Sequence, residues 1–115
     1  MDINRAITCH VQWKSKLTAY IAKPDHSLNA DAVSKDDSCD LGRWIHSEGH
    51  KYAKSSDFAQ LVADHKRFHA AAGQIIRKAD TGQNMKADIV LGAKSGYAYA
   101  SNAVVTGLMK MKQAA

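Results

Sequence analysis

Residues 55–82 have the sequence SSDFAQLVADHKRFHAAAGQIIRKADTG, and this stretch decides the fold. Apolar residues recur in it at steps of three and four, the spacing of one face of an α-helix. The residues at 55–57 are of types that cap the start of a helix, and Thr81 with Gly82 is typical of a helix end. The inward stripe comprises Phe58, Leu61, Val62, His65, Phe68, His69, Ala72, Ile75 and Ile76. The pattern predicts a long amphipathic helix with two histidines on its core face.

Two further segments, one toward each end of the chain, repeat this helical spacing. The first stripe comprises Ile3, Ala6, Ile7, His10, Trp13, Leu17, Tyr20 and Ile21. Pro24 marks the end of that helix, because proline removes a backbone donor and disfavours helical geometry in the residue before it. The other helix is predicted from about Asn84 to Met111. Its stripe comprises Met85, Ile89, Ala93, Tyr97, Ala100, Val104, Leu108 and Met111.

The segment between the first two long helices is polar. Residues 25–38 have few apolar side chains and allow a short helix at most. The Asp36-Asp37-Ser38 run offers N-caps directly before Cys39, and a short helix through Trp44 and Ile45 is expected to stop near Gly49. No strand pattern or internal repeat is present. We therefore predict one all-α domain over residues 1–115, an up-and-down four-helix-type bundle with one or two additional short helices.

Composition excludes several classes of protein. Hydrophobic residues make up 45% of the chain and there is a single proline, so we expect a compact fold. The 16 basic residues give a net charge of +5 but are scattered, which argues against a nucleic-acid surface. The most apolar stretch, Ile89 to Met109, contains a lysine and several polar residues, which argues against membrane insertion. No secretory signal pattern opens the chain, so a cytoplasmic location is expected.

Three histidines lie on predicted core faces, where imidazoles need partners. His65 and His69 are four residues apart, so both project from one helix face about a turn apart. His10 lies in the middle of the first stripe, and Cys39 supplies a thiolate at a helix start, where the helix dipole favours it. Three imidazoles and one thiolate suit zinc better than magnesium or calcium. We predict a zinc site formed by His10, Cys39, His65 and His69.

Other candidates and plainer interpretations stay open at this point. Each of these histidines could be an ordinary core residue, and Cys39 could be buried filler. His46 and His50 form a competing i, i+4 pair, but their surroundings suggest an exposed helix end. His26 falls in a polar loop. Cys9 points about 100° around the helix from its neighbour His10, so it is interpreted as packing, with a redox role as the alternative.

Aromatic and small residues have plain structural roles. Trp13, Trp44 and Phe68 are expected to pack the core and keep water from the metal. Gly42 is expected to allow a close helix approach. The smooth face of the last helix, formed by Gly92, Ala93, Gly96 and Ala100, could pack against a helix of the same chain or of another.

Residues 39–45, CDLGRWI, resemble the signature of the bacterial chemoreceptor zinc-binding (CZB) domain family. His10 with Trp13 resembles the family's first-helix motif, and His65 with His69 resembles its paired histidines on a later helix. The order and spacing of these blocks are similar from about residue 6 to residue 108. The resemblance implies a four-helix-type bundle with a zinc site of three histidines and one cysteine. It also implies a homodimer and attachment to a chemoreceptor or a diguanylate cyclase.

Two functional hypotheses follow. In the first, the chain is a non-enzymatic sensory or regulatory domain of chemotaxis or cyclic-di-GMP signalling, with Cys39 as the trigger for zinc or for an oxidant such as hypochlorous acid. It would be a stand-alone member that acts through a partner or a domain of a longer receptor. In the second, the zinc is structural in a dimerisation or partner-binding module. A metallohydrolase would need an open metal position and a general base, and a hemerythrin-like carrier would need carboxylates, which the inward faces are expected to lack.

Overall fold

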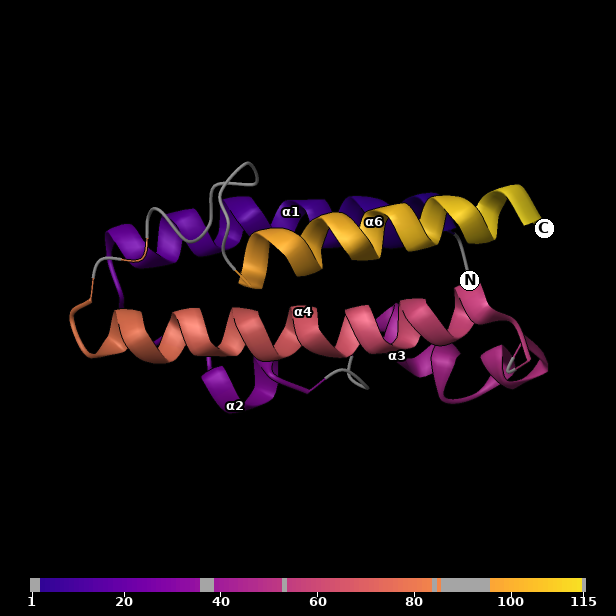
Figure 1. Ribbon diagram of the computed structural model, residues 1–115. Helices are drawn as coiled ribbons and strands as arrows, with labels where there is room; N and C mark the ends of the chain where they lie inside the picture. Colours follow the sequence, from indigo (N-terminus) through magenta and orange to yellow (C-terminus); the bar gives the residue numbers. More distant parts are fainter. Residues whose placement is uncertain (1–2, 36–38, 53, 84, 86–95, 115) are drawn as a thin grey trace.

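A computed structural model describes residues 3–35, 39–52, 54–83, 85 and 96–114, and within these ranges it contains helices and no strand. The predicted all-α class is confirmed. The long helices are α1, α4 and α6, and the short ones are α2, α3 and the 3-10 helix η1 (Figure 1). Their bounds are Ile3–Ala22 for α1, Ala30–Val33 for α2, Asp40–Ile45 for α3, Glu48–Tyr52 for η1, Ser56–Asp80 for α4 and Gly96–Ala114 for α6.

The long helices pack lengthwise with fixed directions. α1 and α4 run the same way, because the Tyr20 hydroxyl near the end of α1 donates to Asp80 at the end of α4, 2.5 Å away. α6 runs against both: Tyr97 near its start packs on Phe68, and Lys112 near its end donates to Asn4. In Figure 1, α6 and α2 lie on opposite sides of α4.

The segment that contains α2 and α3 returns along α4 in the opposite direction. Asp31 forms an ion pair with Arg77, and Cys39 contacts His65 three turns nearer the start of α4. This polar segment has few apolar side chains to bury, so it forms two short helices instead of one long one. A fourth long helix is not among the described residues.

The predicted core stripes are buried for the most part; their half-buried members are Ile3, Ile7, Trp13, Ile21 and Val62. Leu17, Phe68, Val104 and Leu108 are fully enclosed, and all the described stripe residues of α6 are buried. The predicted start of the last helix needs correction: Met85 is buried but lies outside any helix, and Ile89, Gly92 and Ala93 lie outside the described residues. No helix in the described ranges is both long enough and apolar enough to cross a bilayer.

Helix ends follow the expected capping chemistry, with one correction. Ser55 caps α4 by accepting a hydrogen bond from the Phe58 amide, and Thr81 ends the helix. The N-cap of α3 is Cys39 itself, instead of a residue of the 36–38 run. α3 also ends at Ile45, before Gly49, which lies in η1 packed closely between the Trp44 carbonyl and the Phe58 ring.

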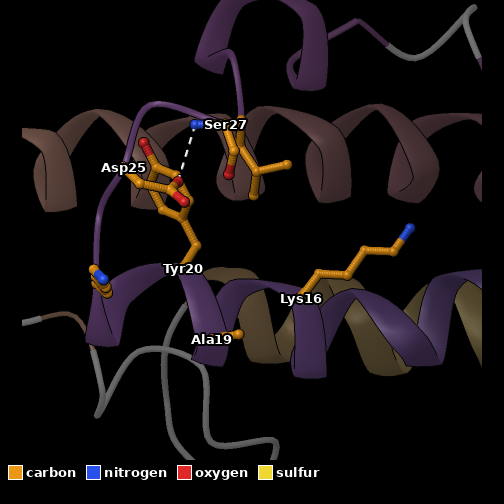
Figure 2. A pocket seen from close by; sticks show the side chains of 7 residues that line it. Lys16, Ala19, Tyr20, Asp25 and Ser27 are labelled. Carbon is orange, nitrogen blue, oxygen red and sulfur yellow. Dashed lines mark hydrogen bonds between the residues drawn. The ribbon is translucent and has the colours of Figure 1, made fainter.

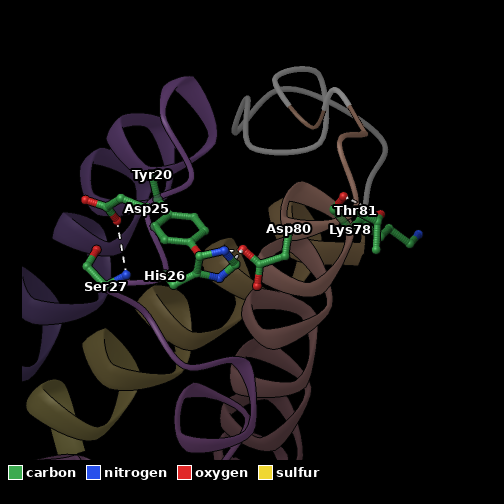
Figure 3. Close-up of polar contacts among 7 residues, drawn as sticks. All are labelled: Tyr20, Asp25, His26, Ser27, Lys78, Asp80 and Thr81. Atoms are coloured by element: carbon green, nitrogen blue, oxygen red, sulfur yellow. Dashed lines mark hydrogen bonds and ion pairs between the residues drawn. The ribbon is translucent and has the colours of Figure 1, made fainter.

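Polar contacts join the far ends of α1 and α4 (Figure 3). The hydrogen bond from Tyr20 to Asp80 raises the pKa of Tyr20. His26 lies in the loop after α1 with a left-handed φ of 63°, exposed as expected, and its Nδ1 is 3.9 Å from Asp80. Beside this loop, Figure 2 shows an open pocket lined by Lys16, Tyr20 and Ser27 among others. The contacts of Tyr20 and His26 with Asp80 position the turn that leads the chain from α1 toward α2.

Candidate metal centre

The four predicted ligands come together in the structure. One donor atom each from His10, Cys39, His65 and His69 lies within 4.8 Å of the other three, and this is the group of possible metal ligands found among the described residues. The histidines are 0–3% exposed, and Cys39 is half-buried. The four donor residues belong to three helices: α1 carries His10, Cys39 is the N-cap of α3, and α4 carries His65 and His69.

The closest donor distances match tetrahedral zinc. Zn–N bonds of about 2.0–2.1 Å and a Zn–S bond of about 2.3 Å give N···N edges of about 3.3 Å and N···S edges of about 3.6 Å. The two Nε2 atoms of His65 and His69 are 3.0 Å apart, and the Cys39 sulfur lies 3.2 and 3.5 Å from them. These atoms therefore surround a point where one ion fits.

His10 completes the set from the opposite helix. Its Nδ1 donates to the Ala6 carbonyl one turn earlier, 2.7 Å away, which leaves Nε2 unprotonated. That Nε2 is buried without a hydrogen-bond partner. A buried acceptor without a partner is unfavourable, and a metal ion at the centre of the four donors would satisfy it. The residues present therefore fit zinc.

The environment of the site keeps the imidazoles of His10 and His65 neutral. Burial, followed by repulsion from the neighbouring histidines, lowers the pKa of His65 to about 3. Burial also lowers the pKa of His10, against a smaller opposing effect of its bond to Ala6. Neutral imidazole is the form that binds a metal ion. The Cys39 sulfur accepts from the Gly42 amide at 3.3 Å, an interaction that favours thiolate.

Sequence analysis missed two features of this region. The His69 Nδ1 donates to the Val33 carbonyl at 2.9 Å, and no residue type signals a backbone acceptor. Asp64 is buried with 7% exposure and accepts from Gln60 and Arg67, so the expectation that inward faces lack carboxylates is wrong. The i, i+4 and i, i+3 spacing of these partners was a signal for it. Asp64 is not part of the donor cluster.

The aromatic residues divide between two places. Phe68 contacts the rings of His10 and His69, with centroids 5.2 and 5.4 Å apart, so it encloses the site as predicted. The ring contacts of Trp44 are with Tyr52 and Phe58 instead, where it packs α3 and η1 against α4. Trp13 is half-buried, with the Lys16 ammonium 4.7 Å above its ring.

The other described candidates, Cys9, His26 and His46, are not members of the donor group. Cys9 is exposed, so its interpretation as a packing residue is wrong, although it does point away from the ligand face as predicted. His46 is exposed at the end of α3, and the side chain of His50 lies outside the described residues.

Comparison with known proteins supports the same assignment. A search of curated proteins and a search of solved structures each gave no match. The sequence model of the chemoreceptor zinc-binding domain family matches residues 10–76, a span that begins at His10 and contains all four donors. The match covers more than half of the 115 residues. The chain therefore belongs to the chemoreceptor zinc-binding (CZB) domain family, and its cofactor is zinc.

Proposed function

We propose that this chain is a regulatory sensor domain of bacterial signalling, in which zinc held by His10, Cys39, His65 and His69 sets the geometry and stability of the bundle. The observation that carries the proposal is the double position of Cys39, whose sulfur is both a donor of the cluster and the N-cap of α3. A chemical change at this one atom therefore acts on the metal and on a helix together.

The energetics suit a switch. Structural zinc contributes about 10–16 kcal/mol of apparent binding free energy at neutral pH, while a whole domain is stable by about 5–15 kcal/mol. Occupancy of one site that links α1, α3 and α4 is therefore comparable with the total stability of the fold. Loss of one donor would be transmitted to all three helices.

Oxidation supplies a specific trigger. Hypochlorous acid transfers its oxygen to a thiolate, which becomes sulfenic acid, while chloride leaves with the electron pair. The half-buried Cys39 is accessible to a small oxidant, and its oxidised sulfur is a poor zinc ligand. The three histidines remain unchanged, so reduction of the sulfur restores the site.

Zinc release on oxidation tests this proposal. We expect equimolar hypochlorous acid to release zinc from the wild type, as followed with a chromogenic chelator, and a thiol reductant with added zinc to reverse the change. The Cys9→Ser variant is the matched control, because Cys9 is exposed on α1 and outside the cluster. It should release zinc as the wild type does. Zinc that stays bound after stoichiometric oxidation, or release that depends on Cys9, would overturn the redox proposal.

A structural zinc site in a dimerisation or partner-binding module is the second candidate. The burial of the three histidines, with Phe68 against two of their rings, favours it, because a metal ion with restricted access exchanges slowly. Oxidant-resistant zinc would select this function. A hydrolytic enzyme is disfavoured, since four protein donors leave no open metal position and residues 66–68, between the paired histidines, include no glutamate.

The partners and location belong to the same proposal. We expect a cytoplasmic homodimer that acts on a chemoreceptor or a diguanylate cyclase. Light scattering of the purified chain tests the dimer: a monomer at micromolar concentration would contradict it.

A further inference from the structure

We infer that α2 is a positioning element of the zinc site, and that Gly73 on α4 is the residue that lets it dock. The inference rests on zinc binding by the proposed function and adds a fourth helix to the site. The geometry points to a chain of three contacts: Gly73 accepts the backbone of α2, α2 presents the Val33 carbonyl, and that carbonyl holds the imidazole of His69.

Gly73 is buried where the backbones of α2 and α4 meet. A Cβ atom at this position would lie 1.9 Å from the Ser34 hydroxyl oxygen, 3.0 Å from the Ala30 carbonyl oxygen and 3.1 Å from the Ser34 Cβ. Real Cβ atoms do not approach another atom to 1.9 Å, and contacts of 3.0–3.1 Å are tight enough that the neighbour must shift. Because the Ser34 hydroxyl donates to the Ala30 carbonyl at 2.7 Å, it cannot turn away without losing that bond. A larger residue fits here only if the Ser34 hydroxyl gives up its bond to Ala30 and the α2 backbone moves away by a few tenths of an ångström.

The position of α2 determines the tautomer and the ring orientation of His69. The Nδ1–H of His69 donates to the Val33 carbonyl, which leaves the Nε2 lone pair directed at the other donors. His10 obtains the same orientation from Ala6 on its own helix, so its tautomer needs no other element. His69 depends on a carbonyl from a different segment, and that segment is fixed only while α2 is docked.

α2 does not hold this position by its own stability. It has four residues, none of them buried, and a helix of one turn is unstable in isolation. It is held on α4 from outside: Ala30 and Val33 pack half-buried against the core, α2 lies against Gly73, the Val33 carbonyl accepts from His69, and Asp31 forms an exposed ion pair with Arg77. Docking of α2 and binding of zinc are therefore linked, and each favours the other by the same factor.

Substitution of Gly73 tests the inference. Gly73→Ala favours helix in α4, so the metal-free protein should keep its helical circular dichroism, while α2 is displaced. We expect zinc affinity, measured by chelator competition, to fall about 10- to 100-fold, the range for loss of a partner of a metal-bound histidine. Gly96→Ala is the matched control, because a Cβ there meets nothing within 4 Å. It should bind zinc as the wild type does.

A second substitution guards against general misfolding. Ser34→Gly in the Gly73→Ala background removes both Ser34 atoms that the new Cβ would meet, so most of the lost affinity should return. Zinc affinity of Gly73→Ala equal to that of the wild type would overturn the inference and leave the proposed function intact. An affinity loss that Ser34→Gly does not reduce would also overturn it.

Hydrogen exchange of the wild type gives an independent test. The amides of Val33 and Ser34 are bonded within the α2 turn, to Asn29 and Ala30. Zinc loading should slow exchange in a peptide that spans these residues, because bound zinc favours docking of α2. Equal exchange with and without zinc would overturn the inference. A wild type that binds no zinc at all would overturn both this inference and the proposed function.

Discussion

Replacement of Cys39 by serine and by alanine separates the two roles of its sulfur. In the structure the sulfur lies 3.2 and 3.5 Å from the two paired imidazoles and also accepts a hydrogen bond from the Gly42 amide. A serine oxygen can still accept that amide bond, since serine is among the preferred N-cap residues. Alanine can neither donate to zinc nor accept the bond from the Gly42 amide. The pair of variants therefore distinguishes loss of a zinc donor from loss of a helix cap.

The magnitudes of the two effects differ. A structural zinc site of four donors contributes about 10–16 kcal/mol, so an equal share is about 2.5–4 kcal/mol per donor, or about two to three orders of magnitude in zinc affinity. The loss of an N-cap costs about 0.5–2 kcal/mol of stability. Both variants should therefore bind zinc about 100- to 1000-fold more weakly than the wild type. In the metal-free state, only Cys39→Ala should be less stable.

Urea unfolding with a chelator and with saturating zinc measures both effects, and chelator competition gives the affinities. We expect the serine variant to match the wild type within about 0.5 kcal/mol when zinc is absent. Wild-type zinc affinity in the serine variant would refute the assignment of Cys39 as a ligand. Equal metal-free stability of the alanine and serine variants would refute its role as a cap.

Two further predictions concern the buried histidines. In the metal-free protein the lowered pKa values of His65 and His10 mean that the unfolded chain takes up protons first, below the ordinary value of 6.5. The free energy of unfolding should therefore fall from pH 6.5 toward pH 3, by up to about 1.4 kcal/mol per pH unit for His65, with His10 adding a fall of the same sign below pH 6.5, and a flat profile in chelator would contradict this. Phe68→Ala should lower stability by about 3–5 kcal/mol and also weaken zinc binding, because Phe68 encloses two ligand rings. Ile76→Ala, two turns further along α4, should lower stability alone, and equal zinc affinities in the two variants would argue against a shielding role for Phe68.

The long helices could be predicted because their information is local. The three- and four-residue spacing around His65 sets the buried face of α4, and Ser55 and Thr81 end the helix where capping chemistry requires. The convergence of His10, Cys39, His65 and His69 was predictable for a related reason. Each lies at a core-facing position or at a helix start, so packing three helices brings their side chains together.

Contacts that depend on backbone placement could not be predicted in this way. The carbonyl of Val33 is chemically the same as every other carbonyl, so only the docked position of α2 makes it a partner of His69. The role of Cys39 as a cap depends on the extended conformation of its backbone, with ψ of 166°. Residues 36–38, which are all preferred N-cap types, were therefore predicted as the cap instead. Trp44 was expected to pack the core and keep water from the metal, whereas its ring contacts are with Tyr52 of η1 and Phe58 of α4.

The buried histidines make the stability of the bundle conditional on zinc. Without a metal ion, His10 Nε2 and His65 Nδ1 have no hydrogen-bond partner, and each buried unsatisfied atom costs about 1–3 kcal/mol. Apolar side chains of similar size would avoid this cost and would pack the same space. A core selected for stability alone would therefore not contain three imidazoles 4.6–5.8 Å apart between ring centres. Because zinc satisfies the His10 nitrogen and links three helices, the stabilisation appears only when the site is filled, which is the energetic requirement for a sensor whose state is read from its shape.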